Sequence, residues 1–255
     1  MPFVNDTKDG LFYRHWPAAE PSATVLVLHG YGEHSGHYRR LAAHLCRDGA
    51  EVWAVDHVGH GLTGAAPDGL FDSVEQLADN AAAVLKHAHA ANPELPVVVV
   101  GHSLGAITAM LLAARAQHRI SGLVLTGAPI AGSPSVDADA PPPIMSKESS
   151  YLDELAHDPY GFVTAAAEPN LWRCLDEALA EVHACSASLS IPVLLIYGDN
   201  DAFTSPAQAE SWSRTFPAAQ LITMTDGYHD IVNDVEHETV ANHITTFVHA
   251  AALER

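Results

Sequence analysis

Short apolar runs rich in Val, Leu and Ile recur along the whole chain. They are continuous and do not alternate with polar residues, which is typical of strands that are covered on both faces. The runs occupy residues 23–28, 51–55, 96–100, 121–126, 191–197 and 219–224. The pattern therefore predicts buried strands of a parallel sheet.

The segments between these runs carry apolar residues at helical spacing. The predicted helices cover residues 37–48, 73–91, 104–117, 206–215 and 231–253. Ser73 and Gln76 have the spacing of a capping box, and Ser205 with Pro206 is a typical helix start. Strands that alternate with helices indicate an α/β fold, with a mostly parallel, doubly wound sheet and right-handed crossovers. Residues 11–16 are expected to add an antiparallel edge strand.

One region, residues 129–188, breaks this alternation. It contains the loop sequence GSPSVDADAPPP and helical patterns at 147–157 and 169–186. We interpret it as a helical lid inserted after the fourth parallel strand. The core domain would then consist of residues 1–128 and 189–255.

The charge of the chain excludes several partners. Its 255 residues include 31 Asp and Glu but only 12 Lys and Arg, which gives a net charge of −19. Binding of nucleic acid or of anionic membranes needs clustered Lys and Arg, so neither is expected. Residues 1–10 are polar and no apolar stretch is long enough to span a bilayer, so we predict a cytoplasmic protein without an integral membrane segment. The insertion is itself strongly acidic, with ten acidic and two basic residues.

The strongest chemical signal is Gly101-His102-Ser103-Leu104-Gly105, which lies between a predicted strand and a predicted helix. This context is that of a nucleophile elbow, a tight turn that presents a serine at a helix N-terminus. A phosphate-binding turn is the alternative, but the segment lacks the P-loop lysine. We therefore expect Ser103 to be a nucleophile.

A nucleophilic serine needs a histidine base and a carboxylate. His229 lies in a loop after the last predicted strand, whereas His237, His243 and His249 fall in the terminal helical pattern. His229 is therefore the expected base. Asp199 and Asp201 both follow the strand at 191–197, and they are both candidates for the carboxylate.

Several motifs together resemble one family. They are His29-Gly30-Tyr31-Gly32-Glu33-His34-Ser35-Gly36, Asp56-His57-Val58-Gly59-His60-Gly61, the Ser103 pentapeptide, Gly198-x-x-Asp201 and His229-Asp230-x-x-Asn233-Asp234. The chain is similar to the monoacylglycerol lipase branch of the α/β-hydrolases. The resemblance implies that Asp201 is the triad acid. It also implies that the backbone N–H groups of Tyr31 and Leu104 form the oxyanion hole.

The resemblance implies a serine ester hydrolase that cleaves monoacylglycerols or similar small lipid esters without a cofactor. A lysophospholipase, a thioesterase, a small-molecule esterase and a catalytically silent ligand-binding relative are the alternatives. The acidic insertion is expected to favour neutral substrates and to contact lipid surfaces transiently; the oligomeric state stays open. Apolar residues that could line the substrate pocket, or that could only pack the lid, are Ile144, Met145, Tyr151, Leu152, Leu155, Phe162, Leu171, Trp172 and Leu175.

Four histidines raise the question of a metal site. His57 and His60 belong to the family motifs, while His87 and His89 are two residues apart in a predicted helix and so face different directions. We predict no metal and no cofactor.

Overall fold

The structure is a computed structural model that describes residues 3–4, 10–64, 68–133, 142–162 and 164–253. Its strands are β1 (Phe3–Val4), β2 (Leu11–Trp16), β3 (Ala23–Leu28), β4 (Ala50–Val55), β5 (Val97–His102), β6 (Gly122–Thr126), β7 (Val193–Gly198) and β8 (Ala219–Met224). They form one eight-stranded sheet in the order β1-β2-β4-β3-β5-β6-β7-β8. All pairs from β4 to β8 are parallel, so each apolar run of the sequence became a parallel strand.

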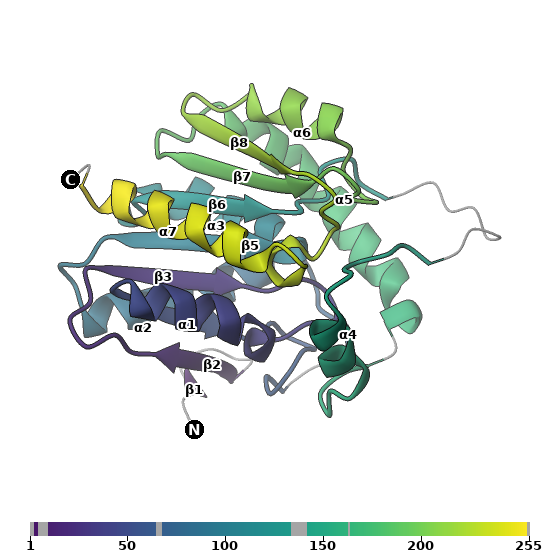
Figure 1. Cartoon of the computed structure of the whole chain (residues 1–255), viewed down its shortest axis with the longest axis horizontal. Helices are drawn as coiled ribbons and strands as arrows, with labels where there is room; N and C mark the ends of the chain where they lie inside the picture. Colours follow the sequence, from purple (N-terminus) through teal and green to yellow (C-terminus); the bar gives the residue numbers. More distant parts are fainter. Residues whose placement is uncertain (1–2, 5–9, 65–67, 134–141, 163, 254–255) are drawn as a thin grey trace.

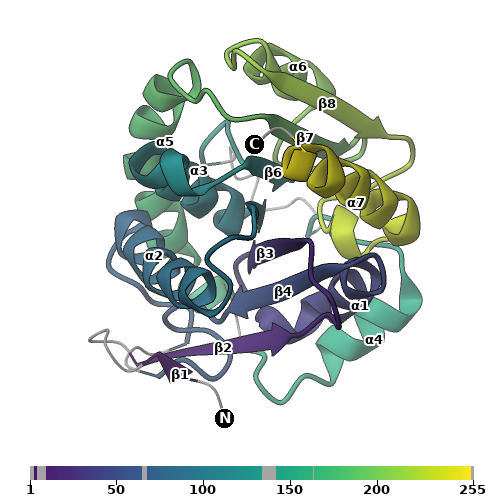
Figure 2. The same cartoon turned by 90° about the vertical axis from the view of Figure 1, so that its left-hand side faces the viewer.

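The helices are α1 (Arg39–Arg47), α2 (Val74–Ala91), α3 (Leu104–Ala116), α4 (Ser149–Ala156), α5 (Glu168–Ser186), α6 (Pro206–Ser213) and α7 (His237–Leu253), with short 3-10 turns η1 (Ser35–Tyr38), η2 (Gln117–Arg119), η3 (Thr164–Ala166) and η4 (Ile231–Asn233). The side chains of α1 and α7 bury one face of the sheet, and those of α2, α3 and α6 bury the other. Figure 2 shows these two layers on opposite sides of the strands. The predicted doubly wound α/β fold is confirmed.

Two predicted elements differ in detail. β2 is antiparallel to β4, as expected, but β1 pairs with its outer side, so β2 is not the edge strand. The terminal helical pattern is divided into η4 and α7, because Asp234 between them has an extended backbone. Its side chain accepts hydrogen bonds from Tyr228 N–H and Lys147 N–H, both at 2.8 Å, which holds it outside the helix.

The inserted region leaves the sheet at the carboxyl ends of the strands (Figure 1). Its first helix, α4, lies beyond the strand ends, whereas the longer α5 runs back along α3 and α2. Leu175, Ala178 and Val182 of α5 belong to the same apolar cluster as α2 and α3. Much of the predicted loop, residues 134–141, lies outside the described residues. Among the described helices, none combines the length and the apolarity needed to cross a bilayer.

Candidate active site

Ser103 occupies a strained turn between β5 and α3. Its backbone has φ 50° and ψ −118°, a region that non-glycine residues rarely adopt. The turn is possible only because glycine flanks it. A Cβ on Gly101 would lie 2.3 Å from Gly105 O, and a Cβ on Gly105 would lie 2.0 Å from Leu28 O. The predicted elbow is thus present, with the Ser103 side chain raised at the first turn of α3.

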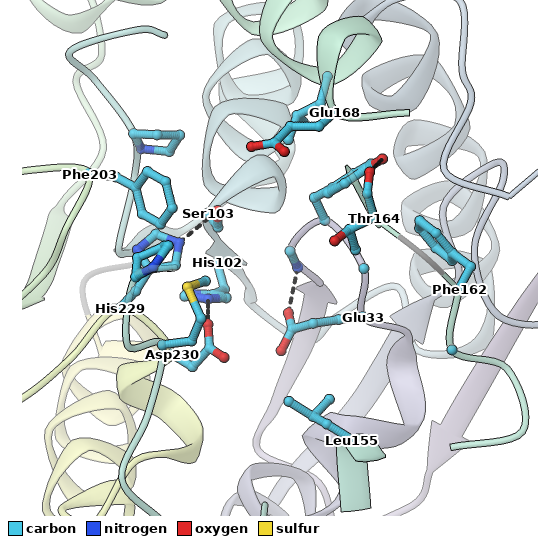
Figure 3. Close-up of a pocket in the computed structure, with 18 of the residues that line it drawn as sticks. Glu33, His102, Ser103, Leu155, Phe162, Thr164, Glu168, Phe203, His229 and Asp230 are labelled. Carbon is cyan, nitrogen blue, oxygen red and sulfur yellow. Dashed lines mark hydrogen bonds and ion pairs between the residues drawn. The ribbon is translucent and has the colours of Figure 1, made fainter. Parts of the chain in front are cut away.

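The side chains of Ser103, His229 and Asp201 form one hydrogen-bonded row. Ser103 Oγ lies 2.9 Å from His229 Nε2, and His229 Nδ1 lies 3.0 Å from Asp201 Oδ2 (Figure 3 shows the first contact). His229 is only 2% exposed. With a proton on Nδ1, which donates to the carboxylate, Nε2 is free to accept the Ser103 hydroxyl proton. The row has the geometry of nucleophile, base and orienting acid.

The structure separates the two candidate carboxylates. Asp201 Oδ1 accepts hydrogen bonds from Phe203 N–H at 2.8 Å and from Thr204 N–H at 3.1 Å. Burial raises the pKa of Asp201, but the neighbouring His229 and these N–H groups outweigh burial and hold the pKa below its ordinary value. Asp199 is exposed, and its Oδ1 accepts a hydrogen bond from the Asn200 side-chain amide at 3.0 Å.

The loop after β3 lies directly beside the serine. A Cβ on Gly30 would lie 3.3 Å from Ser103 Cβ, so only glycine allows this approach. Among the described residues, neither Tyr31 N–H nor Leu104 N–H has a hydrogen-bond partner. Glu33 Oε2 accepts the Gly30 N–H at 2.7 Å and so fixes the loop from within. An oxyanion hole requires unpaired N–H donors of this kind near the attacking group, so the predicted oxyanion hole at Tyr31 and Leu104 stays a prediction compatible with this geometry.

A buried polar network continues from this loop. Tyr151 OH lies 2.9 Å from Glu33 Oε1 and 3.2 Å from Asp230 Oδ2. His102 Nδ1 is 3.1 Å from Thr126 O, and its Nε2 is 3.3 Å from Asp230 Oδ1. Both imidazole nitrogens therefore face acceptors. Burial lowers the pKa of His102, but Asp230 and Glu33 outweigh burial and raise the pKa above its usual value.

These groups open into a cavity of about 390 Å³. Seven of the nine predicted pocket residues line it, namely Met145, Tyr151, Leu155, Phe162, Leu171, Trp172 and Leu175. Ile144 and Leu152 do not, because their side chains are 54% and 42% exposed and lie outside the cavity. Apolar spacing alone did not reveal which side of the insertion they occupy.

The cavity also holds residues that the sequence analysis did not single out. Phe203 packs edge-on against His229 with ring centroids 4.5 Å apart, and Glu168 also lines the cavity (Figure 3). Four lining residues are acidic: Glu33, Asp158, Glu168 and Asp230. Glu33 and Asp230 stood inside the family motifs, but Phe203 and Glu168 carry no local sequence signal.

The four histidines considered for a metal do not form a cluster. Burial lowers the pKa of His57 to about 3 and that of His60 to about 4, so both are neutral. His87 lies 3.1 Å from Tyr13 OH on another part of the surface. In the described part of the chain, the groups of three potential ligands are His34, His37 and Asp158, and His102, His229 and Asp230.

The strand order and the row of Ser, His and Asp side chains define an α/β-hydrolase. The chain matches the family model described as "Serine aminopeptidase, S33" (Hydrolase_4) over residues 19–158 and 135–236. It is 28% identical to the monoacylglycerol lipase of Mycolicibacterium smegmatis over 93% of this chain and 92% of the relative. The monoglyceride lipase of Rattus norvegicus is also 28% identical, over 92% and 87%. The chain therefore belongs to this α/β-hydrolase family and is a carboxylic ester hydrolase of the monoacylglycerol lipase type.

Solved structures show the same fold. A monoacylglycerol lipase of Paleococcus ferrophilus has a TM-score of 0.79 at 21% identity and covers 94% of this chain and 99% of its own. A thermostable carboxyl esterase from Bacillus coagulans, solved with glycerol, has a TM-score of 0.80 at 22% identity and covers 99% and 100%.

Proposed function

We propose that the protein hydrolyses monoacylglycerols or similar small neutral lipid esters through an acyl-enzyme on Ser103. The observation that carries the proposal is the hydrogen-bonded row Ser103–His229–Asp201 beside a cavity lined by both apolar and polar side chains. The family model is named after a peptidase, so the substrate class rests on the relatives and on the side chains that line the cavity. A cytoplasmic location stays a prediction.

The reaction follows from the geometry. His229 takes the Ser103 proton as the hydroxyl attacks the ester carbonyl, and Asp201 stabilises the imidazolium that forms. The N–H groups of Tyr31 and Leu104 would hold the developing oxyanion, and each such donor stabilises the transition state by roughly 3 kcal/mol. His229 then protonates the departing alcohol and activates a water molecule for deacylation. No cofactor takes part in this scheme.

The mixed lining supports a substrate with an apolar chain and a hydroxylated head. Leu155, Leu171 and Leu175 offer apolar contacts for an acyl chain. Glu33 and Asp230 also line the cavity, and although both accept a hydrogen bond from Tyr151 OH, their carboxylate oxygens keep further lone pairs that can accept from alcohol groups. Such acceptors favour a hydroxylated alcohol over a purely apolar one.

The charge of the cavity supports a preference for neutral esters. Four carboxylates line it, and none of its described lining residues is Lys or Arg. A phosphate or carboxylate on the substrate would meet repulsion that little water screens. We therefore favour a monoacylglycerol over an anionic lysophospholipid. Outside the cavity, the exposed side chains of Ile144, Leu152 and Tyr160 are those through which the insertion would contact a lipid surface transiently.

The direct test is Ser103→Ala. Measured with a monoacylglycerol, kcat should fall by about 10⁴-fold or more while the fold stays intact, because the nucleophile is lost. A serine-directed fluorophosphonate should label the wild type but not this variant. Unlabelled wild-type protein would instead favour a silent ligand-binding relative.

A substrate panel separates the remaining alternatives. Monoacylglycerols, an anionic lysophospholipid and a thioester of one acyl chain length should be compared at low salt, where charge effects are largest. We expect the highest kcat/KM for the neutral glycerol ester. Glu168→Gln should reduce the difference in kcat/KM between the neutral ester and the anionic lysophospholipid. Equal kcat/KM values for these two substrates in the wild type would refute the charge argument.

A further inference from the structure

A second cluster of ligating side chains lies outside the catalytic row. It consists of His34, which directly precedes η1, His37, which lies within η1, and Asp158, which follows α4 in the insertion. His34 Nε2 lies 3.0 Å from Asp158 Oδ2, and His37 Nε2 lies 3.1 Å from the same oxygen. The three ligand atoms lie within 4.8 Å of one another. Residues distant in the sequence thus converge on one point between the sheet and the insertion.

His37 is the unusual member. Its side chain is 1% exposed, and among the described residues neither ring nitrogen has a hydrogen-bond partner. Nε2 is close to Asp158 Oδ2, but the direction between them does not make a hydrogen bond. A buried imidazole with two unpaired nitrogens is costly, and such groups are rare in folded proteins. Because Nε2 lies beside two other potential ligand atoms, a cation bound between them would supply the missing partner.

We propose that His34, His37 and Asp158 bind a divalent transition-metal ion such as Zn²⁺. Two imidazoles and one carboxylate, with water as the fourth ligand, are a common tetrahedral set for zinc. Ligand atoms about 2.0–2.2 Å from one ion lie roughly 3.4 Å apart in that geometry. The separations of His34 Nε2 and His37 Nε2 from Asp158 Oδ2, 3.0 and 3.1 Å, are close to this value, so little movement would admit the ion.

The tautomer of His34 determines which of its hydrogen bonds must change when a metal ion binds. Gly36 N–H donates to His34 Nδ1 at 2.9 Å, so the proton of the neutral ring lies on Nε2 and faces Asp158. When the metal binds Nε2, this proton moves to Nδ1 and the Gly36 contact is given up. Two hydrogen bonds of His34, one from Gly36 N–H and one to Asp158, are therefore exchanged for metal–ligand bonds, and the ring stays neutral.

The surroundings admit a cation from solvent. An adjoining hollow of about 470 Å³ is lined by His34, His37, Asp158 and by the acidic residues Asp153 and Glu154. Arg39 also lines it, but its guanidinium is paired with Glu154. Because His34 and His37 follow the loop of Tyr31 and Asp158 also lines the substrate cavity, the ion would fasten the α4 side of the insertion to the oxyanion loop.

The test measures metal binding directly. Protein freed of metal with a chelator is titrated with Zn²⁺ against a chromophoric competitor, and with Co²⁺ for its visible absorption. We expect one Zn²⁺ per chain, with an affinity that falls at least tenfold in Asp158→Asn and in His34→Gln. Zn²⁺ should also raise the melting temperature of the wild type but not that of Asp158→Asn.

Matched variants exclude other zinc sites. Asp153→Asn and His157→Gln change an exposed acid and an exposed histidine of the same hollow, and both should bind Zn²⁺ within twofold of the wild type. His229→Gln removes a ligand of the cluster in the catalytic site. Equal binding by wild type and both cluster variants, or loss of zinc only in His229→Gln, would overturn the proposal. If Asp158→Asn does not fold, His34→Gln decides.

Discussion

The cavity lies between a floor, made of the loops at the carboxyl ends of the strands that include Ser103, and a roof, made of α4 and α5 of the inserted region. The floor and the roof are held in place by different interactions. On the floor, the position of Ser103 is fixed by the backbone of three neighbouring segments, since Gly101, Gly105 and Leu28 leave no room for another arrangement. In the roof, α5 is fixed by apolar burial in the main core, whereas α4 is joined to the floor through polar side chains. The inserted region therefore has two parts: α5 belongs to the apolar core, whereas α4 is joined to the rest mainly by polar contacts.

The largest effect is expected on the floor. Gly105→Ala places a Cβ 2.0 Å from Leu28 O, so β3 and α3 must separate. We expect a loss of more than about 4 kcal/mol of stability or no folded protein, measured by urea unfolding. Gly64→Ala is the matched control, since its Cβ would meet no atom within 4 Å. Similar stability for both variants would contradict the backbone argument.

The two helices of the roof should respond differently to the same truncation. Leu175 of α5 is 1% exposed, so Leu175→Ala should lower the unfolding free energy by about 2–5 kcal/mol. Leu152 of α4 is 42% exposed, and Leu152→Ala should change the unfolding free energy by about 0.5 kcal/mol or less. Equal losses in denaturant unfolding would show that α4 and α5 are held alike.

Acid should weaken the floor. The pKa values of His57 and His60, about 3 and about 4, lie below the unfolded value of 6.5, so the unfolded chain binds more protons between pH 6.5 and 4. The unfolding free energy is therefore unaffected by these groups above pH 6.5 and falls as the pH decreases. At pH 5 each group costs about 2 kcal/mol. His57→Gln should flatten this pH dependence, whereas the exposed His87→Gln should leave it as in the wild type.

The smallest effect concerns the polar connection of α4. Asp234 accepts hydrogen bonds from Ser146 Oγ and Lys147 N–H before α4, and from Tyr228 N–H beside His229. Asp234→Asn keeps one carbonyl oxygen and turns an N–H₂ toward one of these donors. We expect a loss of about 1–2 kcal/mol in stability together with a lower kcat, measured on a neutral ester.

Asp226→Asn is the control for this experiment, because Asp226 is exposed in the same loop region and its backbone φ of 57° suits asparagine. Unchanged kcat in Asp234→Asn would mean that the α4 connection does not support the position of His229.

The sequence predicted the floor better than the roof. Continuous apolar runs define parallel strands, and the carboxyl ends of such strands meet at one edge, so Ser103, Asp201 and His229 could be expected together. The roof depends on contacts between distant segments. Tyr151 meets Glu33, and Asp158 meets His34, although neither pair has any local signal. The apolar pattern also predicted Ile144 and Leu152 as pocket residues alongside Leu155, because the pattern does not tell which side of the segment faces the cavity.

The shared burial of α5 also bears on how such a protein can change its substrate over generations. A substitution in Leu175 alters the cavity and the core at once, so it is tolerated only when neighbours compensate. The segment from Tyr151 to Phe162 lines the cavity at Tyr151, Leu155, Asp158, Gly161 and Phe162 but contributes no residue to the two apolar core clusters. Substitutions that change the substrate specificity should therefore accumulate first in that segment, while the sequence of α5 changes as slowly as that of the rest of the core.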